Sequence, residues 1–354
     1  MSSLSLFLIS ILFTIAYSHL FRYMAPYLGL LDKADDVRKK HIGTPALVGG
    51  IAIIMSVMTA SLILSVSVPL WLAIGAILFL LLGVIDDAVN VRPIWKLGAQ
   101  FIIVLGVVLF GGVQLASLGN LLGLGDISLG FMAVPITIIA ILIFINAMNM
   151  MDGLDGLGGG VNLMMLCGIF LLHKLFIVDS AEQGLLLLLI FSLLGFLLFN
   201  MRNPWRKKAM IFLGDGGSLC LGFVIAWLSI DITQVKVNDG VSPMVIAWIL
   251  SLPIFDLISV TVRRLREGHH PFKPDQRHIH HLLCHKGWTV NKAVPFLIFL
   301  TAIYGAIGIF GWYAGISDTL LFIGWVCALI GHFIWTMNLD KEEKTNKPKF
   351  IGLF

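Results

Sequence analysis

Charged side chains are scarce in this 354-residue chain. Asp, Glu, Lys and Arg make up only 12% of it, hydrophobic residues make up 58%, and the mean hydropathy is +0.96. A soluble globular protein carries about 25% charged residues, which keep its surface hydrated. The scarcity therefore excludes an ordinary soluble domain and indicates an integral membrane protein.

Cysteine is also rare, and the four cysteines are scattered. No CxxC pair is present, so their spacing gives no indication of a metal site or a disulfide framework. The N-terminus lacks the basic segment and the small-residue cleavage site of a signal peptide. Residues 4–28 are therefore expected to stay in the protein as its first membrane span.

Long apolar runs dominate the chain. A helix of about 20 apolar residues crosses the hydrocarbon core, and about eleven runs meet this criterion. They cover residues 4–28, 45–66, 69–86, 97–113, 131–150, 159–177, 184–200, 212–230, 244–262, 294–315 and 318–338. Spanning segments must satisfy their own backbone hydrogen bonds, which favours helices. The predicted fold is all-α: a polytopic integral membrane helical bundle of about 11 transmembrane helices, forming a single domain over residues 1–354.

Lys and Arg are distributed unequally between alternate loops. They concentrate after the first, third, seventh and ninth runs and in the basic tail, 339–354, whereas the opposite loops hold only Lys174 and Lys236. Because basic residues mark cytoplasmic loops, this predicts a periplasmic N-terminus and a cytoplasmic tail. The net charge of +4 follows from the same bias, and no feature indicates a nucleic-acid partner.

Acids, amides and histidines at the same predicted membrane edge are not explained by topology. Asp86 and Asp87 end the run LLGVIDD. Two adjacent carboxylates near hydrocarbon are costly. They either terminate the helix or form a cation site or general base, in which one charge raises the pKa of the other carboxyl group.

A second cluster lies in the segment NAMNMMDGLDGL. Residues three apart are neighbours on a helix, so Asn146, Asn149 and Asp152 are expected to form a polar ridge, with Asp155 following it. The glycines that follow let the backbone approach a ligand closely. This segment is the strongest candidate for a binding site.

A third cluster, FLGDGGS, surrounds Asp215 with glycines at an expected helix start. It is either a turn with an N-cap or a set of backbone N–H groups that face an anion or a cation–phosphate pair.

Histidines form the fourth cluster, His278, His280 and His281, near Arg263 and Arg264. Histidines bind Zn²⁺ or donate hydrogen bonds to phosphate oxygens, and the nearby arginines favour phosphate.

The first loop forms the fifth cluster. Lys33, Arg38 and Lys39 suit a polyanion, although positive-inside bias explains them nearly as well. Asp256 lies inside an apolar run, seven residues before Arg263, which suggests an internal ion pair.

Together these clusters place carboxylates, amides and cations on one face of the membrane. Carboxylate and amide oxygens suit Mg²⁺, which proteins bind through one or two oxygens plus substrate phosphates. Cationic side chains would hold the remaining phosphate charge, as in phosphoryl transfer. The location at the membrane edge suggests a lipid phosphate as one substrate.

The motifs LLGVIDD, NAMNMMDGLDGL, FLGDGGS and RHIHH occur in an order that resembles the polyprenyl-phosphate N-acetylhexosamine-1-phosphate transferases of the MraY-like superfamily. The resemblance covers residues 31–281. HIHH is similar to the bacterial branch that uses UDP-GlcNAc, whereas the phospho-MurNAc-pentapeptide branch has three consecutive histidines. Two features depart from this branch: Ala34 stands where family members usually have Pro, and GTPALVGG is similar to the pentapeptide branch.

The resemblance implies a multi-pass enzyme of the bacterial cytoplasmic (inner) membrane with its active site on the cytoplasmic face. UDP-GlcNAc and undecaprenyl phosphate would give undecaprenyl-diphosphate-GlcNAc and UMP, either directly or through a covalent aspartyl intermediate. This step would initiate a lipid-linked polysaccharide such as O antigen, common antigen or teichoic acid. The cofactor would be Mg²⁺, with Mn²⁺ as a substitute, and the partners would be both substrates, membrane lipids and a second copy in a homodimer.

The resemblance also implies roles for individual residues. Asp215 and Asn149 would hold Mg²⁺, and Asp86 or Asp87 would deprotonate or position the lipid phosphate. Asp152 and Asp155 would serve the metal and the nucleotide. The remaining candidates would bind substrate phosphates or sugar: His278, His280, His281, Arg263, Arg264, Lys33, Arg38, Lys39 and Asn146.

Three alternatives remain open from the sequence. The first is the phospho-MurNAc-pentapeptide transferase of peptidoglycan synthesis. The second is a transporter of an anionic nucleotide-linked solute, although transporters place polar residues near the bilayer midplane between repeated halves. The third is a non-catalytic scaffold, which would tolerate substitution of the acids.

Overall fold

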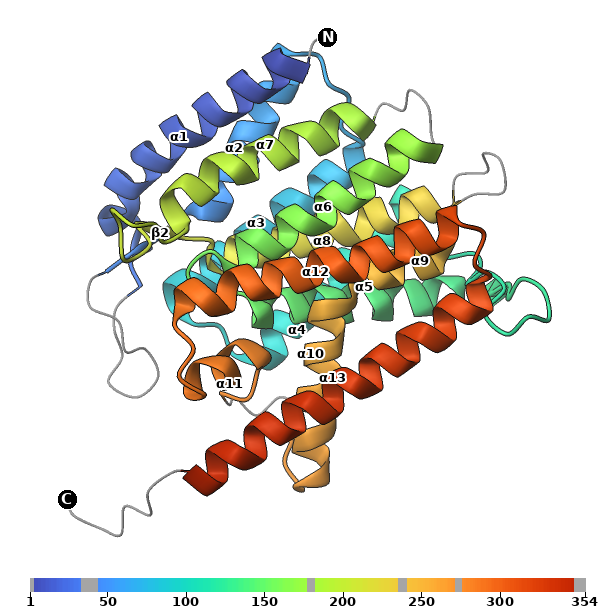
Figure 1. Ribbon diagram of the computed structural model, residues 1–354. Coiled ribbons are helices and arrows are strands. Elements are labelled where there is room, and N and C mark those ends of the chain that lie inside the picture. Colours follow the sequence, from blue (N-terminus) through green and yellow to red (C-terminus); the bar gives the residue numbers. More distant parts are fainter. Residues whose placement is uncertain (1–2, 33–43, 177–181, 235–240, 271–275, 347–354) are drawn as a thin grey trace.

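The computed structural model describes residues 3–32, 44–176, 182–234, 241–270 and 276–346 (Figure 1). In chain order its elements are α1 (Ser3–Leu28), β1 (Ala46–Leu47), α2 (Gly49–Ile63), α3 (Leu70–Val89), α4 (Pro93–Gly111), the 3₁₀ helix η1 (Gly130–Met132), α5 (Ala133–Met151), α6 (Leu157–Phe176), α7 (Glu182–Asn200), β2 (Ile211–Phe212), α8 (Gly214–Gln234), α9 (Pro243–Ile249), α10 (Ser251–Arg266), α11 (Ile279–His285), α12 (Val290–Tyr313) and α13 (Asp318–Asn346). The predicted helical membrane bundle is confirmed.

Nine helices in the described part of the chain are long and apolar enough to cross a membrane, and the pair α9 and α10 makes a tenth if it counts as one span. The shorter α2 has 15 residues, a length of about 22 Å at 1.5 Å per residue. Every predicted run therefore contains a helix. The number of crossings and the orientation of the termini stay predictions.

The predicted span 244–262 consists of two helices with a break between them. Helices α9 and α10 meet at an angle of 73°. Pro253 lies in the first turn of α10 and has no N–H to donate to the carbonyl of Ile249, where α9 ends. The break lets α10 diverge from the other helices and cross α13 (Figure 1).

Helix α8 forms the centre of the bundle and contacts α2, α3, α5 and α6. In its spanning window 89% of the residues are buried, against 17% in the outer helix α13. Small residues allow close approach: a Cβ added at Gly83 of α3 would overlap the backbone of Asp215 and Gly216. This packing brings the end of α3 against the start of α8.

A small parallel sheet corrects the purely helical prediction. Ala46 pairs with Ile211 and Leu47 with Phe212, so β1 and β2 join the segments that precede α2 and α8. These strands are two residues long and far apart in sequence, so no local pattern could indicate them. The sheet brings Leu47 and Phe212 to the same place.

The alternating directions of the helices bring one set of helix ends together. The ends of α3, α5 and α7 lie at the same end of the bundle as the starts of α4, α6 and α8. Residues of four predicted polar clusters, Asp87, Asp152, Asp215 and His280, lie at or beside this end. Helix α13 continues to Asn346, so the predicted tail 339–354 starts as a helical extension.

Candidate active site

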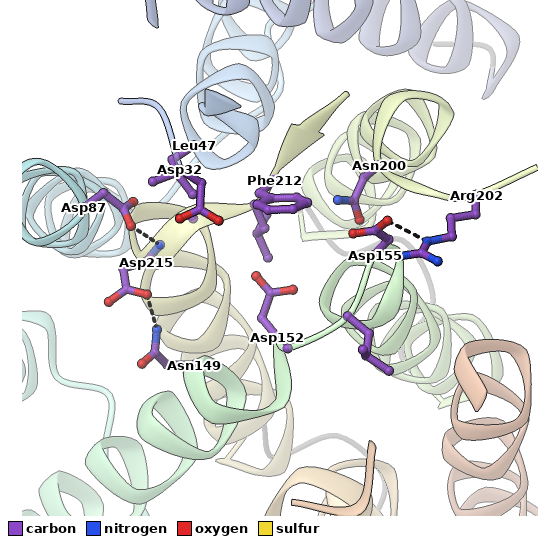
Figure 2. Close-up of a pocket in the computed structure, with 14 residues that line it drawn as sticks. Asp32, Leu47, Asp87, Asn149, Asp152, Asp155, Asn200, Arg202, Phe212 and Asp215 are labelled. Carbon is purple, nitrogen blue, oxygen red and sulfur yellow. Dashed lines mark hydrogen bonds and ion pairs between the residues drawn. The ribbon is translucent and has the colours of Figure 1, made fainter. Parts of the chain in front are cut away.

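A cavity of about 460 Å³ opens at this end of the bundle (Figure 2). Its lining combines acids, amides, one arginine and a few apolar side chains. The lining residues are Asp32, Leu47, Asp87, Asn149, Asp152, Gly153, Leu154, Asp155, Asn200, Arg202, Phe212, Leu213, Gly214 and Asp215. The structure thus joins the acids of three separate predicted clusters in one site.

The adjacent acids Asp86 and Asp87 have different surroundings. Asp87 lines the cavity and accepts hydrogen bonds from the backbone N–H groups of Asp215 (3.1 Å) and Gly216 (3.3 Å). The N–H groups at the start of α8, which were predicted to face an anion, therefore face this carboxylate. Asp86 accepts from the N–H of Val91 (2.8 Å). Of the two, Asp87 is the one at the cavity.

Asp215 is the centre of a charged network. Its Oδ1 accepts a hydrogen bond from Asn149 Nδ2 (2.9 Å), and its Oδ2 contacts Lys96 Nζ (Figure 2 shows the Asn149 contact). Lys96 also pairs with Asp86 at 2.6 Å, and Asn149 donates to Ser218 as well (2.8 Å). One lysine from α4 therefore lies between two carboxylates and offsets part of their mutual repulsion.

Asp152 does not continue the predicted helical ridge. Helix α5 ends at Met151, and the carboxylate of Asp152 hydrogen-bonds the backbone of Gly158 in the first turn of α6. Burial, with the charges of Asp215 and Asp155 adding to it, raises the pKa of Asp152 to about 7. This carboxyl group can therefore hold or release a proton near neutral pH.

The other two members of the predicted ridge face different partners. Asn149 turns to α8, as described above, whereas Asn146 donates a hydrogen bond to Gln100 Oε1 of α4 (2.7 Å). Asn146 lines a separate apolar groove and not the cavity. The structure thus divides the ridge between two neighbouring surfaces.

Asp155 closes the opposite side of the cavity. Its Oδ2 accepts from Arg202 Nε (2.7 Å) and from the N–H of Ala209 (3.1 Å) (Figure 2). Nearby, Asn200 accepts from the N–H of Gly156 and donates to the carbonyl of Ile211, both at 2.9 Å. The DGLDG loop is thereby tied to the segment that precedes α8.

Sequence reasoning missed Lys96, Arg202 and Asn200. The positive-inside bias explained both cations, and so hid their role. Asn200 ends an apolar run and offered a weak signal, since an amide there is unusual. Its partners come from the segments around residues 156 and 211, which only the fold identifies.

The predicted histidines lie next to the cavity and do not line it. The ring of His280, which is 1% exposed, packs on Gly153 so closely that a Cβ added to this glycine would overlap it. Neither ring nitrogen of His280 has a hydrogen-bond partner among the described residues. Burial, with the charges of neighbouring histidines, lowers its pKa well below the usual range. His280 is therefore neutral at physiological pH.

Arg263 and Arg264 are also buried, at 4% and 2% exposed, and neither lines the cavity. Asp256, for which the sequence suggested an ion pair with Arg263, pairs with His278 at 2.7 Å. The predicted residues Lys33, Arg38 and Lys39 lie outside the described residues. Asp32, which directly precedes them, lines the cavity.

An apolar groove of about 330 Å³ runs beside the polar cavity. It is lined by residues of α4, α5 and α10: Leu97, Leu142, Ile143, Asn146, Met150, Leu257, Ile258, Thr261 and Val262. Helix α5 borders both spaces, since Asn149 lines the cavity while Asn146 and Met150 line the groove. Helix α4 contributes Lys96 to the polar network and Leu97 to the groove. Helix α5 thus lies between a charged cavity and an apolar groove.

The donor set of the cavity fits a hard divalent cation. Asp87, Asp152, Asp215 and Asn149 all contribute oxygens and line one space. Among the described residues no three His, Cys, Asp or Glu side chains surround a common point. A cation such as Mg²⁺ would therefore need further ligands from phosphate or water, which is its usual mode of binding.

Comparisons with known proteins identify the family of the chain. The model of glycosyl transferase family 4 matches residues 69–233. A Haemophilus influenzae protein is 31% identical over 306 residues, covering 86% of this chain and 85% of its own. Proteins of Yersinia pestis (33% over 306 residues; 85% and 82%) and Escherichia coli K12 (32% over 314 residues; 87% and 83%) are similar. All three are named undecaprenyl-phosphate alpha-N-acetylglucosaminyl 1-phosphate transferase. With this similarity over most of its length, the chain belongs to glycosyl transferase family 4.

Proposed function

We propose that this protein transfers GlcNAc-1-phosphate from UDP-GlcNAc to undecaprenyl phosphate, with Mg²⁺ as cofactor, on the cytoplasmic face of the bacterial inner membrane. One observation carries the proposal: the same helix, α5, lines both an acidic cavity and an apolar groove of a membrane bundle. The reaction joins a water-soluble nucleotide sugar to a membrane lipid, and needs such a pair of sites. The names of the relatives support the same substrates.

The groove suits the lipid acceptor. Apart from Asn146 and Thr261 its lining is aliphatic or Met, and it is open enough to take the first isoprene units of a polyprenyl chain. A phosphate at the end of that chain would reach the boundary near Lys96, the cation that already pairs with Asp86 and Asp215. Positive charge there would offset the charge of the acceptor phosphate.

The cavity suits the nucleotide sugar. One side carries the aromatic ring of Phe212 with Leu154 and Asn200, which fit a base or a ribose. The other side carries Asp87, Asp152 and Asp215. Carboxylates repel a diphosphate, so this arrangement binds one only with a cation between them. Arg202 supplies part of the positive charge and Mg²⁺ would supply the rest.

The chemistry is a displacement at phosphorus. An oxygen of the lipid phosphate attacks the β-phosphorus of UDP-GlcNAc, the bond from that phosphorus to the bridging oxygen breaks, and UMP leaves. When bound, Mg²⁺ neutralises phosphate charge and stabilises the charge that develops in the transition state. Asp215 and Asn149 would hold it, and Asp87 would orient the acceptor. Asp152, whose pKa is about 7, can exchange a proton at the working pH.

The test is a membrane assay with undecaprenyl phosphate, Mg²⁺ and UDP-[¹⁴C]GlcNAc. We expect label in the lipid phase with an equal amount of UMP, loss of activity with EDTA and recovery with Mg²⁺ or Mn²⁺. Release of UDP would mean simple glycosyl transfer and would overturn the mechanism. Recovery with Zn²⁺ alone would move the metal to the histidines. If no label is transferred, UDP-MurNAc-pentapeptide is the next donor to test, followed by uptake of unaltered solute into proteoliposomes.

A further inference from the structure

Asp256, an acid outside the cavity, holds the histidine segment, residues 277–281. Asp256 of α10 is 1% exposed. Its Oδ2 lies 2.7 Å from Nδ1 of His278, and its Oδ1 accepts a hydrogen bond from the N–H of Ile279 (2.8 Å). Ile279 is the first residue of α11, so Asp256 caps that helix from a different helix.

Arg263 gives the same segment a second attachment. It lies seven residues, about two turns, after Asp256, so both side chains point to one face of α10. Its Nη2 donates to the carbonyl of Arg277 at 2.7 Å, and its Nη1 donates to the carbonyl of Thr336 in α13 at 3.3 Å. Two side chains of α10 therefore hold three consecutive residues of the segment.

The attachment reaches the cavity through a short path. His280 follows directly in α11, and its ring packs against Gly153, which lines the cavity between Asp152 and Leu154. A movement of α11 would therefore move or release the wall that carries Asp152.

We propose that Asp256 is a positioning residue for the transfer reaction: it holds His278 with a proton on Nδ1 and fixes α11 against the cavity wall. A ring that donates through Nδ1 to a carboxylate presents Nε2 to any further partner. The inference rests on the proposed function for its catalytic part and on geometry alone for its structural part. Titratable groups that act on Asp256 are His278 and His280 of the segment and His332 of α13.

Two substitutions separate the two parts of the proposal. Asp256→Asn keeps an oxygen for the N–H of Ile279, but its NH₂ group forces the proton of His278 onto Nε2. We expect kcat to fall about 10–100-fold, the range for an outer residue that orients a ligand or catalytic group, with KM for UDP-GlcNAc changed less than about threefold. The pH profile of kcat/KM should also change shape, because the substitution removes an ionisable carboxylate that contacts the imidazole of His278.

Asp256→Ala removes both hydrogen bonds and should loosen α11. Cys284, in this helix, reports the change: in a background without the other three cysteines, a membrane-impermeant maleimide should label it severalfold faster than in the parent. Labelling in Asp256→Asn should match the parent. The control is Asp318→Asn, which also removes a carboxylate that accepts a backbone N–H (Asn120, 3.2 Å) but lies at the opposite end of the bundle.

Several results would overturn the proposal. One is an Asp256→Asn enzyme with kcat within about twofold of the parent and the same pH profile. Another is loss of activity by one factor at every pH together with faster Cys284 labelling, which indicates damage to the fold only. If Asp256→Ala does not fold, Asp256→Asn decides. If the parent transfers no GlcNAc-1-phosphate, the proposed function fails, and unchanged labelling in Asp256→Ala would separately refute the structural part.

Discussion

The three acids Asp87, Asp152 and Asp215 and the single acid Asp256 lie near the same end of the bundle and have different surroundings. Asp87, Asp152 and Asp215 line an open cavity, where the negative charge of Asp215 repels the charges of Asp87 and Asp152. Asp256 does not line this cavity, and one histidine with one backbone N–H occupies both its oxygens. The cavity acids also have partners inside the protein, but they border a space that a ligand can enter, whereas Asp256 does not line that space.

This difference shows that a buried acid in a membrane helix has more than one use. Carboxylates that lie close together repel one another and destabilise the fold, and a bound cation offsets this repulsion. An acid with a complete set of partners stabilises and orders its surroundings. The comparison predicts that substitutions in the cavity reduce turnover directly, and that those around Asp256 act through geometry.

The largest effect is expected for Asp215→Asn. The amide keeps the shape but removes a charge that would hold the metal, so turnover should fall on the order of 10³-fold. The protein should still elute as a folded species in detergent. Activity near that of the parent would show that Asp215 does not hold the metal, and would weaken the contrast between the cavity acids and Asp256.

Lys96→Met is expected to come next. It leaves Asp86 and Asp215 without their shared cation, so activity should fall about 10²-fold and the melting temperature in detergent should drop. Lys96→Arg keeps the charge and should retain more of both. If Lys96→Met melts lower but turns over normally, the lysine is purely structural.

Gly153→Ala tests the contact between the cavity wall and helix α11. The added Cβ overlaps the His280 ring, so α11 must shift and turnover should fall about tenfold, since small misplacements at a site are costly. The melting temperature should fall too and should recover when His280→Ala is added, because the overlap is then relieved. Gly106→Ala, with open space around its Cβ position, is the control.

The smallest effect concerns stability and Asp152. Its pKa, raised to about 7, means that the folded state binds this proton more tightly than the unfolded state. The free energy of unfolding therefore decreases as pH rises from about 4 to about 7. With EDTA present, Asp152→Asn should melt a few degrees above the parent at pH 8, and the difference should shrink toward pH 5. A difference that is independent of pH would contradict the assignment.

The sequence predicted the membrane bundle and most of the cavity acids because both have local signals. Apolar runs reveal helices by length alone, and Asp87, Asp152 and Asp215 stand out where the runs end. The role of Lys96 had no such signal, because any cytoplasmic loop of a membrane protein contains lysine. The position of Asp152 after the end of α5 was also missed, because helix ends vary by one or two residues.

The sequence by itself determined that this protein is built for a membrane, where its apolar helices lie along the chain, and that its polar residues follow the ends of those helices. Hydropathy and charge act residue by residue, so these properties can be read locally. Only the tertiary structure decided which acid meets which partner: Asp87 with the start of α8, Asp215 with Lys96, and Asp256 with His278. Those pairs join segments 22 to 128 residues apart, and packing of helices and not local propensity brings them together.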